Sequence, residues 1–289
     1  MTTVSIIIPI YKPKLTINEQ ASLEQCLKIL GHYPIIFFAP EGLDKREYNK
    51  LVNKYLSVNV KFEFFNKGYF TSIKGYNKLL VSPKFYKRFK ENEYILIYQL
   101  DAWVFRDELK YWCDKGYDYI GAPWISKKGN SLLSGVGNGG FSLRKTSTML
   151  EVLNTKLHKR LKCSLLKDNI IYRGFTNLII PDYKTFPFRY FNFGKIKKLR
   201  KASLWLYYPL LKDSIFLTKL FIIYEDVFWS KYAPKLYKNM LIPCHSEGLK
   251  FAFELYPSIC YETNSKKLPF GCHAWDKRES DFWQKYIII

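Results

Sequence analysis

Residues 94–101 decide the fold class, because an apolar run ends there in one acidic side chain: Tyr94-Ile95-Leu96-Ile97-Tyr98-Gln99-Leu100-Asp101. A short run of Ile, Leu and Tyr is typical of a strand that is buried on both faces. Asp101 follows at its carboxyl end, which is where open α/β sheets bind their ligands. We therefore expect a strand over 94–100 that leads directly into a ligand site.

The sequence before this strand alternates between strand-like and helix-like segments. Strands are expected over 4–9, 34–40 and 58–65, and helices over 18–30, 70–80 and 85–90. Such alternation predicts an α/β fold in which helices flank a Rossmann-like, mainly parallel central sheet. Tyr11 and Glu41 follow the first two strands, so we expect them at the same edge of the sheet as Asp101.

The length and composition indicate how many hydrophobic cores the chain can form and in which cell compartment we expect it. With 289 residues and 48% hydrophobic residues, the chain can bury one large core or a main domain with a smaller lobe. Its six cysteines show no CxxC spacing, and the first residues show no signal-peptide pattern, so we expect a reduced, cytoplasmic protein. No apolar run reaches the roughly 18 residues that span a bilayer, so membrane contact would be peripheral.

The charge is strongly positive and unevenly distributed. A net charge of +21 favours anionic partners, and residues 156–220 alone hold 15 Lys/Arg against 3 Asp. Within this basic and aromatic insertion, residues 195–211 suit contact with an anionic membrane at the inner face of the cell membrane. A solvated cationic face is an equal alternative. Single-stranded nucleic acid fits less well, because the chain has no RRM, KH, zinc or helix-turn-helix signature.

Asp101 and a glycine-rich loop are the first candidates for chemistry. A carboxylate at the end of a strand can hold Mn²⁺ or Mg²⁺, which neutralises the charge of a diphosphate leaving group. An ordinary loop aspartate is the alternative. Residues 135–140 carry four glycines, so their backbone can approach a ligand closely. A plain tight turn is the less favoured explanation of the glycines, and the loop lacks the ending of a Walker motif.

Polar residues in the C-terminal part of the sequence complete the set of candidate site residues. Asp226 is a candidate base for an acceptor hydroxyl, and Glu225 would bind acceptor hydroxyls or orient the helix that follows. Two acids also stabilise any helix N-terminus, which is the alternative. His273 can serve as a neutral metal ligand or, when protonated, as a donor to phosphate oxygens, although a lone histidine is often structural.

The order of these candidate residues along the sequence resembles that of the matching motifs in the GT-A glycosyltransferases. Residues 100–103, Leu100-Asp101-Ala102-Trp103, resemble the DxD segment, but Gln99 or Trp103 stands where the second acid belongs. The segments 117–124 and 137–144 resemble a bacterial glycosyltransferase family associated with capsule and lipopolysaccharide biosynthesis. Glu225-Asp226 and, near the C-terminus, His273 follow in the same order along the sequence as the corresponding residues of GT-A enzymes.

The resemblance implies a GT-A-like fold and a role for each matching residue. A donor-binding half over 1–145 and an acceptor-binding half over 146–289 would form one domain. Asp101 and His273 would hold the metal, Asp226 would act as base, and Glu225 would assist. The donor would contact the following residues: Tyr11, Glu41, Asp101, Trp103, Gly137, Asn138, Gly139 and Gly140. Trp124 and Trp229 would contact the acceptor.

The expected activity is glycosyl transfer. A sugar would pass from a nucleoside diphosphate sugar, with UDP favoured, to a hydroxyl of a cell-surface glycan precursor that could be lipid-linked. Transfer with inversion of the anomeric configuration is favoured. The alternative from another class is a non-catalytic glycan- or nucleic-acid-binding protein that retains the fold, which the incomplete DxD motif allows. A nucleotidyltransferase is disfavoured, because no glycine-rich segment with lysine follows the first strand.

Overall fold

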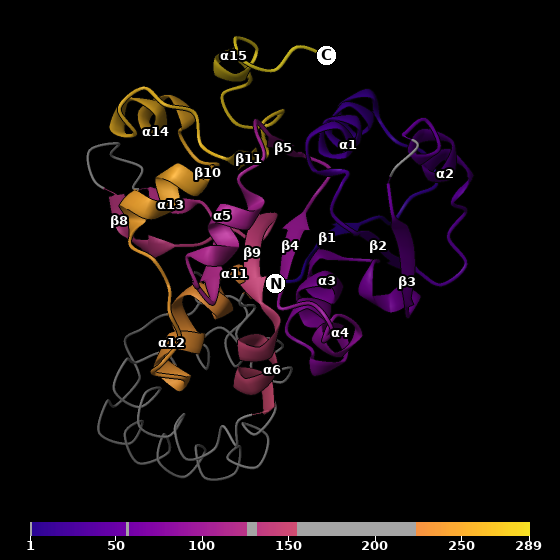
Figure 1. Cartoon of the computed structure of the whole chain (residues 1–289), viewed down its shortest axis with the longest axis horizontal. Helices are drawn as coiled ribbons and strands as arrows, with labels where there is room; N and C mark the ends of the chain where they lie inside the picture. Colours follow the sequence, from indigo (N-terminus) through magenta and orange to yellow (C-terminus); the bar gives the residue numbers. More distant parts are fainter. Residues whose placement is uncertain (1, 56–57, 126–131, 155–223) are drawn as a thin grey trace, which may run out of the picture.

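The computed structural model describes residues 2–55, 58–125, 132–154 and 224–289. Its centre is a six-stranded sheet in the order β3-β2-β1-β4-β9-β6. Figure 1 labels β3, β2, β1, β4 and β9 in this order. The strands are β1 (Val4–Pro9), β2 (Ile35–Pro40), β3 (Val60–Phe65), β4 (Tyr94–Tyr98), β6 (Tyr119–Ile120) and β9 (Phe141–Lys145). β3, β2, β1 and β4 run parallel, and β9 is antiparallel to β4 and β6. This confirms the α/β class with a mainly parallel central sheet.

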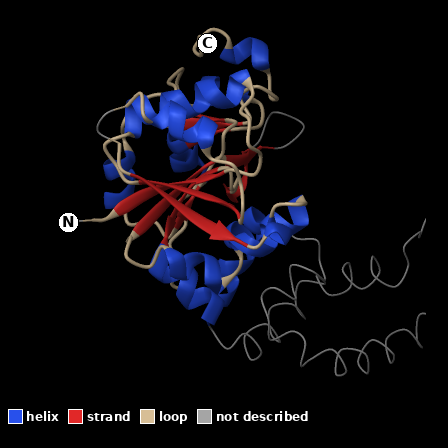
Figure 2. Ribbon diagram, turned by 90° about the vertical axis from the view of Figure 1, so that its right-hand side faces the viewer, coloured by secondary structure: helices blue, strands red, loops and turns tan. Residues whose placement is uncertain are grey.

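Helices cover both faces of the sheet (Figure 2). They are α1 (Ile17–Leu30), α2 (Arg46–Val52), η1 (Lys67–Tyr69), α3 (Ile73–Leu80), α4 (Pro83–Arg88), α5 (Leu109–Asp114) and α6 (Thr146–Asn154). Side chains alternate along β1, so Ile6 and Ile8 pack with α1, α2 and α5, whereas Ile7 packs with α3, α4 and α6. Two apolar cores therefore hold the sheet, which explains why its central strands are apolar on both faces.

A second sheet, β10-β11-β5, joins the C-terminal part of the chain to the middle. Its strands are β5 (Ala102–Val104), β10 (Ala252–Phe253) and β11 (Gly271–His273). β5 and β11 pair antiparallel, with His273 opposite Ala102. This register brings His273 next to Asp101, although the two are far apart in sequence.

The remaining elements surround these sheets. They are β7 (Pro123–Ile125), β8 (Leu132–Val136), α11 (Glu225–Val227), the π-helical turn η4 (Phe228–Tyr232), α12 (Ala233–Leu236), α13 (His245–Phe251), α14 (Pro257–Thr263) and α15 (Ser280–Trp283). In the part of the chain that the structure describes, no helix is long and apolar enough to cross a membrane. The insertion 156–220 and the expected membrane segment 195–211 lie outside the described residues.

Element ends differ from expectation where side chains cap them. The helix expected over 70–80 begins only at Ile73, because Ser72 accepts a hydrogen bond from the Gly75 N–H. The helix expected over 85–90 begins earlier, because Ser82 caps it and Pro83 suits the first turn. The strand expected over 94–100 ends at Tyr98.

Candidate functional site

Asp101 lies in a tight turn between β4 and β5, not directly at the end of a strand. The turn is closed by the Ala102 N–H, which donates to the Gln99 carbonyl at 2.8 Å. The Asp101 side chain is mostly buried, and each of its oxygens contacts a cationic group. Oδ1 lies 3.0 Å from His273 Nε2, and Oδ2 accepts from the Lys277 ammonium at 2.7 Å. The turn thus presents a carboxylate that is already paired on both sides.

The His273 ring lies between the carboxylates of Asp101 and Glu254. Besides Asp101, its Nε2 contacts Gln99 Oε1 at 3.1 Å, and its Nδ1 lies 3.4 Å from Glu254 Oε1. Burial disfavours a charged imidazole, but Asp101 and Glu254 outweigh this and raise the pKa of His273 to about 10. Conversely, burial would raise the pKa of Asp101, but His273 and Lys277 lower it below its ordinary value. We therefore describe His273 as an imidazolium that bridges two carboxylates.

The glycine-rich loop leaves room for these side chains. A Cβ added to Gly140 would clash with the His273 ring, and one added to Gly139 would clash with Glu225 Oε1. Asn138 has a left-handed φ of 58°, and its Oδ1 accepts from the Gly140 N–H at 3.0 Å. The two glycines are therefore required by close approach: Glu225 and His273 pack against consecutive positions of one loop.

Glu225 forms a buried ion pair with Arg144 of β9. Arg144 Nη1 and Nη2 donate to Glu225 Oε2 and Oε1, each at 2.8 Å, and the two residues are 0% and 3% exposed. Arg144 also donates to Ser142 Oγ and to Tyr86 Oη, each at 3.0 Å. Burial opposes the charge of Arg144, yet the Glu225 carboxylate raises its pKa well above the ordinary value. Both carboxylate oxygens are engaged, so the geometry favours the alternative in which Glu225 orients the helix.

Asp226 lies beside this pair in the first turn of α11. Its Oδ1 accepts from the Val227 N–H at 2.7 Å. Burial raises the pKa of Asp226, and the nearby Glu254 carboxylate raises it further. The backbone N–H of Glu225 donates to Asn77 Oδ1 at 2.8 Å, which fixes the start of α11 on α3. Asp226 is thus a partly buried carboxyl group on a firmly held helix start.

A divalent cation fits this site poorly. Such ions prefer several oxygen ligands, but here both oxygens of Asp101 contact cationic groups and Glu254 is engaged by His273. Among the described residues, no three His, Cys, Asp or Glu side chains are arranged to hold a metal ion. The side chains present therefore do not fit the metal site at Asp101 and His273 that the resemblance implies.

Two tryptophans lie in the core and not at a ligand surface. Trp103 is 7% exposed and packs edge-on against Trp275 at a centroid distance of 5.7 Å. Trp229 is 0% exposed, and its Nε1 donates to the Leu80 carbonyl at 3.1 Å. This corrects the donor role expected for Trp103 and the acceptor role expected for Trp229, because neither ring has a face free for a sugar.

Trp124 is the remaining aromatic candidate for the acceptor. It is only partly buried, and the ammonium of Lys231 lies 5.1 Å from its ring centroid. A Cβ at Gly137 would clash with the Trp124 indole, so this glycine too is required by close approach. The indole Nε1 is buried and has no hydrogen-bond partner within the described ranges. Trp124 therefore borders the glycine-rich loop with an unused donor.

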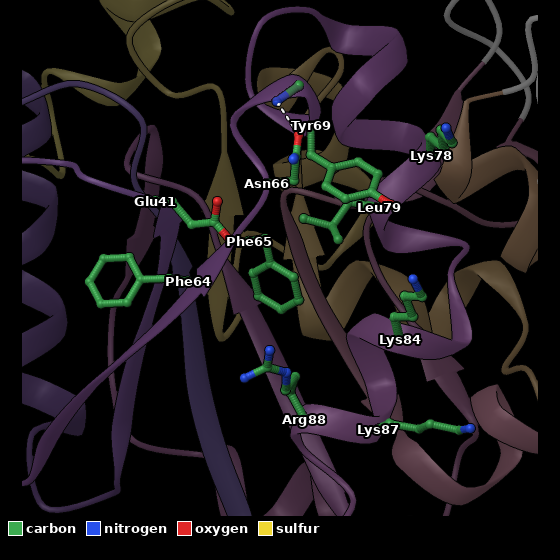
Figure 3. Close-up of a pocket in the computed structure, with 11 residues that line it drawn as sticks. Glu41, Phe64, Phe65, Asn66, Tyr69, Lys78, Leu79, Lys84, Lys87 and Arg88 are labelled. Carbon is green, nitrogen blue, oxygen red and sulfur yellow. Dashed lines mark hydrogen bonds between the residues drawn. The ribbon is translucent and has the colours of Figure 1, made fainter.

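Tyr11 and Glu41 lie in different surroundings. Tyr11 is 60% exposed and lies close enough to Lys277 to help raise the pKa of that lysine. Glu41 instead borders a cavity of about 720 Å³ at the ends of β2 and β3 (Figure 3). The cavity is lined by four cationic side chains from α3 and α4: Lys78, Lys84, Lys87 and Arg88. Of the expected site residues, only Glu41 lines this cavity.

Comparison with known proteins identifies the family. Residues 59–273 match the family described as "Protein of unknown function (DUF5672)". The chain belongs to this family. The matched range extends from the residue before β3 to His273, so it includes Asp101, Arg144, Asp226 and Glu254. No curated protein matches the sequence.

Solved structures of glycosyltransferases resemble the chain remotely. The glycosyltransferase GlyE of Streptococcus pneumoniae TIGR4 has a TM-score of 0.45 and 10% identity, over 100% of this chain and 61% of its own. Residues 1–349 of TarS of S. aureus, in complex with UDP-GlcNAc, have a TM-score of 0.34 and 15% identity, over 52% and 47%. The chain thus spans about half of the TarS structure. At these scores the likeness carries no argument about activity.

Three residues that contact Glu225, His273 or Asp101 were not expected from the sequence: Arg144, Glu254 and Lys277. Arg144 ends the segment 137–144, where an arginine in an apolar strand indicates a buried partner. Glu254 follows the apolar run 251–253, as Asp101 follows its own strand. Lys277 carries no comparable signal, because it is one of the chain's 46 Lys and Arg residues. Only the pairing of β5 with β11 brings it to Asp101.

Proposed function

We propose that this protein is a glycosyltransferase that uses a nucleoside diphosphate sugar as donor. The proposal depends on one observation: Asp101, Glu254, His273 and Lys277 meet at the Asp101 turn, while Asp226 lies near Glu254 with a raised pKa. Cationic groups suit a diphosphate, and a buried carboxyl group with a raised pKa suits a base. The fold contributes the ligand-binding edge of a mainly parallel sheet.

The donor would extend along this edge. We place its diphosphate at Lys277, beside Asp101, and its nucleoside toward Tyr11 and Glu41. Neighbouring strands are about 4.8 Å apart, so the ends of β2 and β4 are separated by roughly 10 Å, which suits an extended nucleotide. The sugar would then lie near the glycine-rich loop, beside the Glu225 and His273 side chains that pack against Gly139 and Gly140.

Asp226 would activate the acceptor. It takes the proton of the acceptor hydroxyl as that oxygen forms a bond to the anomeric carbon. The bond between this carbon and the diphosphate oxygen breaks, and the diphosphate leaves with the electron pair. Attack from the face opposite the leaving group inverts the configuration. The pair Glu225–Arg144 would position Asp226 by fixing the start of α11.

Trp124 would supply the acceptor platform. Its partly buried ring can pack against a sugar face. The acceptor class we favour is a glycan of the cell surface, as in capsule or lipopolysaccharide synthesis. Whether that glycan is lipid-linked, and whether 195–211 brings the protein to an anionic membrane, are hypotheses that vesicle sedimentation would test. Equal pelleting with neutral and anionic vesicles would count against the membrane contact.

A donor panel tests the proposal directly. The protein is incubated with UDP-, GDP- and dTDP-sugars, and released nucleoside diphosphate is measured with and without a mixture of oligosaccharide acceptors. We expect slow hydrolysis of one donor, abolished in Asp226→Asn. If several donors bind but none turns over with any acceptor, the protein is a glycan- or nucleotide-binding protein that retains the fold. If no donor binds, the proposal fails.

A further inference from the structure

A lysine from the turn after β11 contacts Asp101 where the resemblance implies a metal ion. Lys277 Nζ lies 2.7 Å from Asp101 Oδ2, while Oδ1 faces His273 Nε2 at 3.0 Å. No second acid stands two positions from Asp101 in the sequence, because Gln99 and Trp103 occupy those positions. Trp103 is turned into the core, and Gln99 donates to Tyr76 Oη at 3.0 Å.

We propose that Lys277 supplies the positive charge for the donor diphosphate, in place of a divalent cation, and that Asp101 positions this lysine. The inference rests on the proposed function and names a binding residue that the sequence did not indicate. The ligand class is a nucleoside diphosphate, alone or with its sugar.

The geometry gives Lys277 the capacity for this role. An ammonium has three N–H donors, and Asp101 Oδ2 accepts one of them. The lysine side chain remains 63% exposed, so a phosphate oxygen can reach another donor. Its backbone belongs to a turn in which the N–H groups of Lys277 and Arg278 both donate to the Ala274 carbonyl. The turn directly follows β11, so the same strand pairing that brings His273 to Asp101 also brings Lys277.

Two of the acids around the Asp101 turn, Glu254 and Glu225, are already paired. Glu254 faces His273 Nδ1 at 3.4 Å, and Glu225 is held at both oxygens by Arg144. A cation that bound Asp101 would therefore compete with Lys277 and His273 and would find no free carboxylate among these acids. A diphosphate, in contrast, would be attracted to this site, because its negative charge complements the exposed ammonium of Lys277.

The test is calorimetric titration of the full chain with UDP, GDP and dTDP, in EDTA and again in MnCl₂. The variants are Lys277→Met, which keeps most of the apolar stem, and Lys277→Arg, which keeps the charge. The exposed Lys285→Met is the matched control for loss of one cation. Thermal melting checks that each variant folds. Wild-type protein should bind one nucleoside diphosphate with the same affinity in both buffers.

Lys277→Met should weaken this binding about 10- to 100-fold in both buffers, which corresponds to the loss of one hydrogen bond to a charged group. Lys277→Arg should retain most of the affinity, and Lys285→Met should retain all of it. A further variant, Lys277→Asp, places a second carboxylate beside Asp101, so its binding should become dependent on Mn²⁺.

The alternative outcomes separate the two proposals. If wild-type protein binds a nucleoside diphosphate only with Mn²⁺, the lysine does not replace the metal and the inference is overturned, while the proposed function stands. If binding occurs in EDTA but Lys277→Met leaves it unchanged, Lys277 is not the binding residue. If none of the nucleoside diphosphates or donor sugars binds in either buffer, the proposed function is overturned together with the inference.

Discussion

Removing the Glu225 carboxylate should destabilise the whole protein. Glu225→Ala leaves the guanidinium of Arg144 at 0% exposure without its anionic partner, while Ser142 and Tyr86 still accept from it. Breaking a buried pair by removing one partner costs about 3 to 5 kcal/mol of unfolding free energy. For a chain of this size each kcal/mol lowers Tm by about 2 to 4 °C, so Tm should fall by about 6 to 20 °C.

A double-mutant cycle distinguishes an unpaired charge from lost packing. Calorimetric melting would compare Glu225→Ala, Arg144→Met and the double variant. The double variant should be more stable than the sum of the two single losses predicts, because it leaves no unpaired buried charge. Strictly additive losses, or a fall of less than about 2 °C for Glu225→Ala, would refute the reasoning that this pair is buried and holds the start of α11.

Three further predictions concern the site. Asp226→Asn should abolish transfer but leave donor affinity within about twofold by calorimetry; measurable turnover would reject the base. Burial raises the pKa of Asp226, and a base must be deprotonated, so kcat/KM should fall with decreasing pH through a pKa above that of an ordinary aspartate; a rate flat across that range would contradict it. Gly140→Ala should push the His273 ring away from Asp101 and weaken donor binding more than Gly116→Ala, which strains only the backbone at a φ of 74° because its added Cβ meets no neighbour; equal effects would show that the contact is unimportant.

Local patterns in the sequence predicted the fold class because a strand or helix is recognised by residues close together in the chain. The alternation of apolar strands and amphipathic helices predicted the four parallel strands within two residues of their ends. Capping by Ser72 and Ser82 accounts for the shifted helices. The turn that ends β4 at Tyr98 was missed, because it depends on β5 turning toward β11 and not on any local glycine or proline.

The roles of the tryptophans could not be read from the sequence. Trp103 and Trp229 follow Asp101 and Asp226 by two and three positions, and the resemblance implied ligand contacts for both. Along β5, however, side chains alternate in direction, and Trp103 faces the same core cluster as Trp275. Trp229 turns toward α3 and α4 in the same way. Neighbourhood in the sequence does not determine on which side of an element a side chain lies.

The sequence by itself determined the α/β class and selected Asp101, the glycine-rich loop, Asp226 and His273 as the polar residues to examine. Only the tertiary structure decided that Asp101 is paired with His273 and with Lys277, a residue 176 positions away. The physical reason is that periodicity is local, whereas the charge state and the free ligand positions of a carboxylate depend on which distant cations the strand register brings to it.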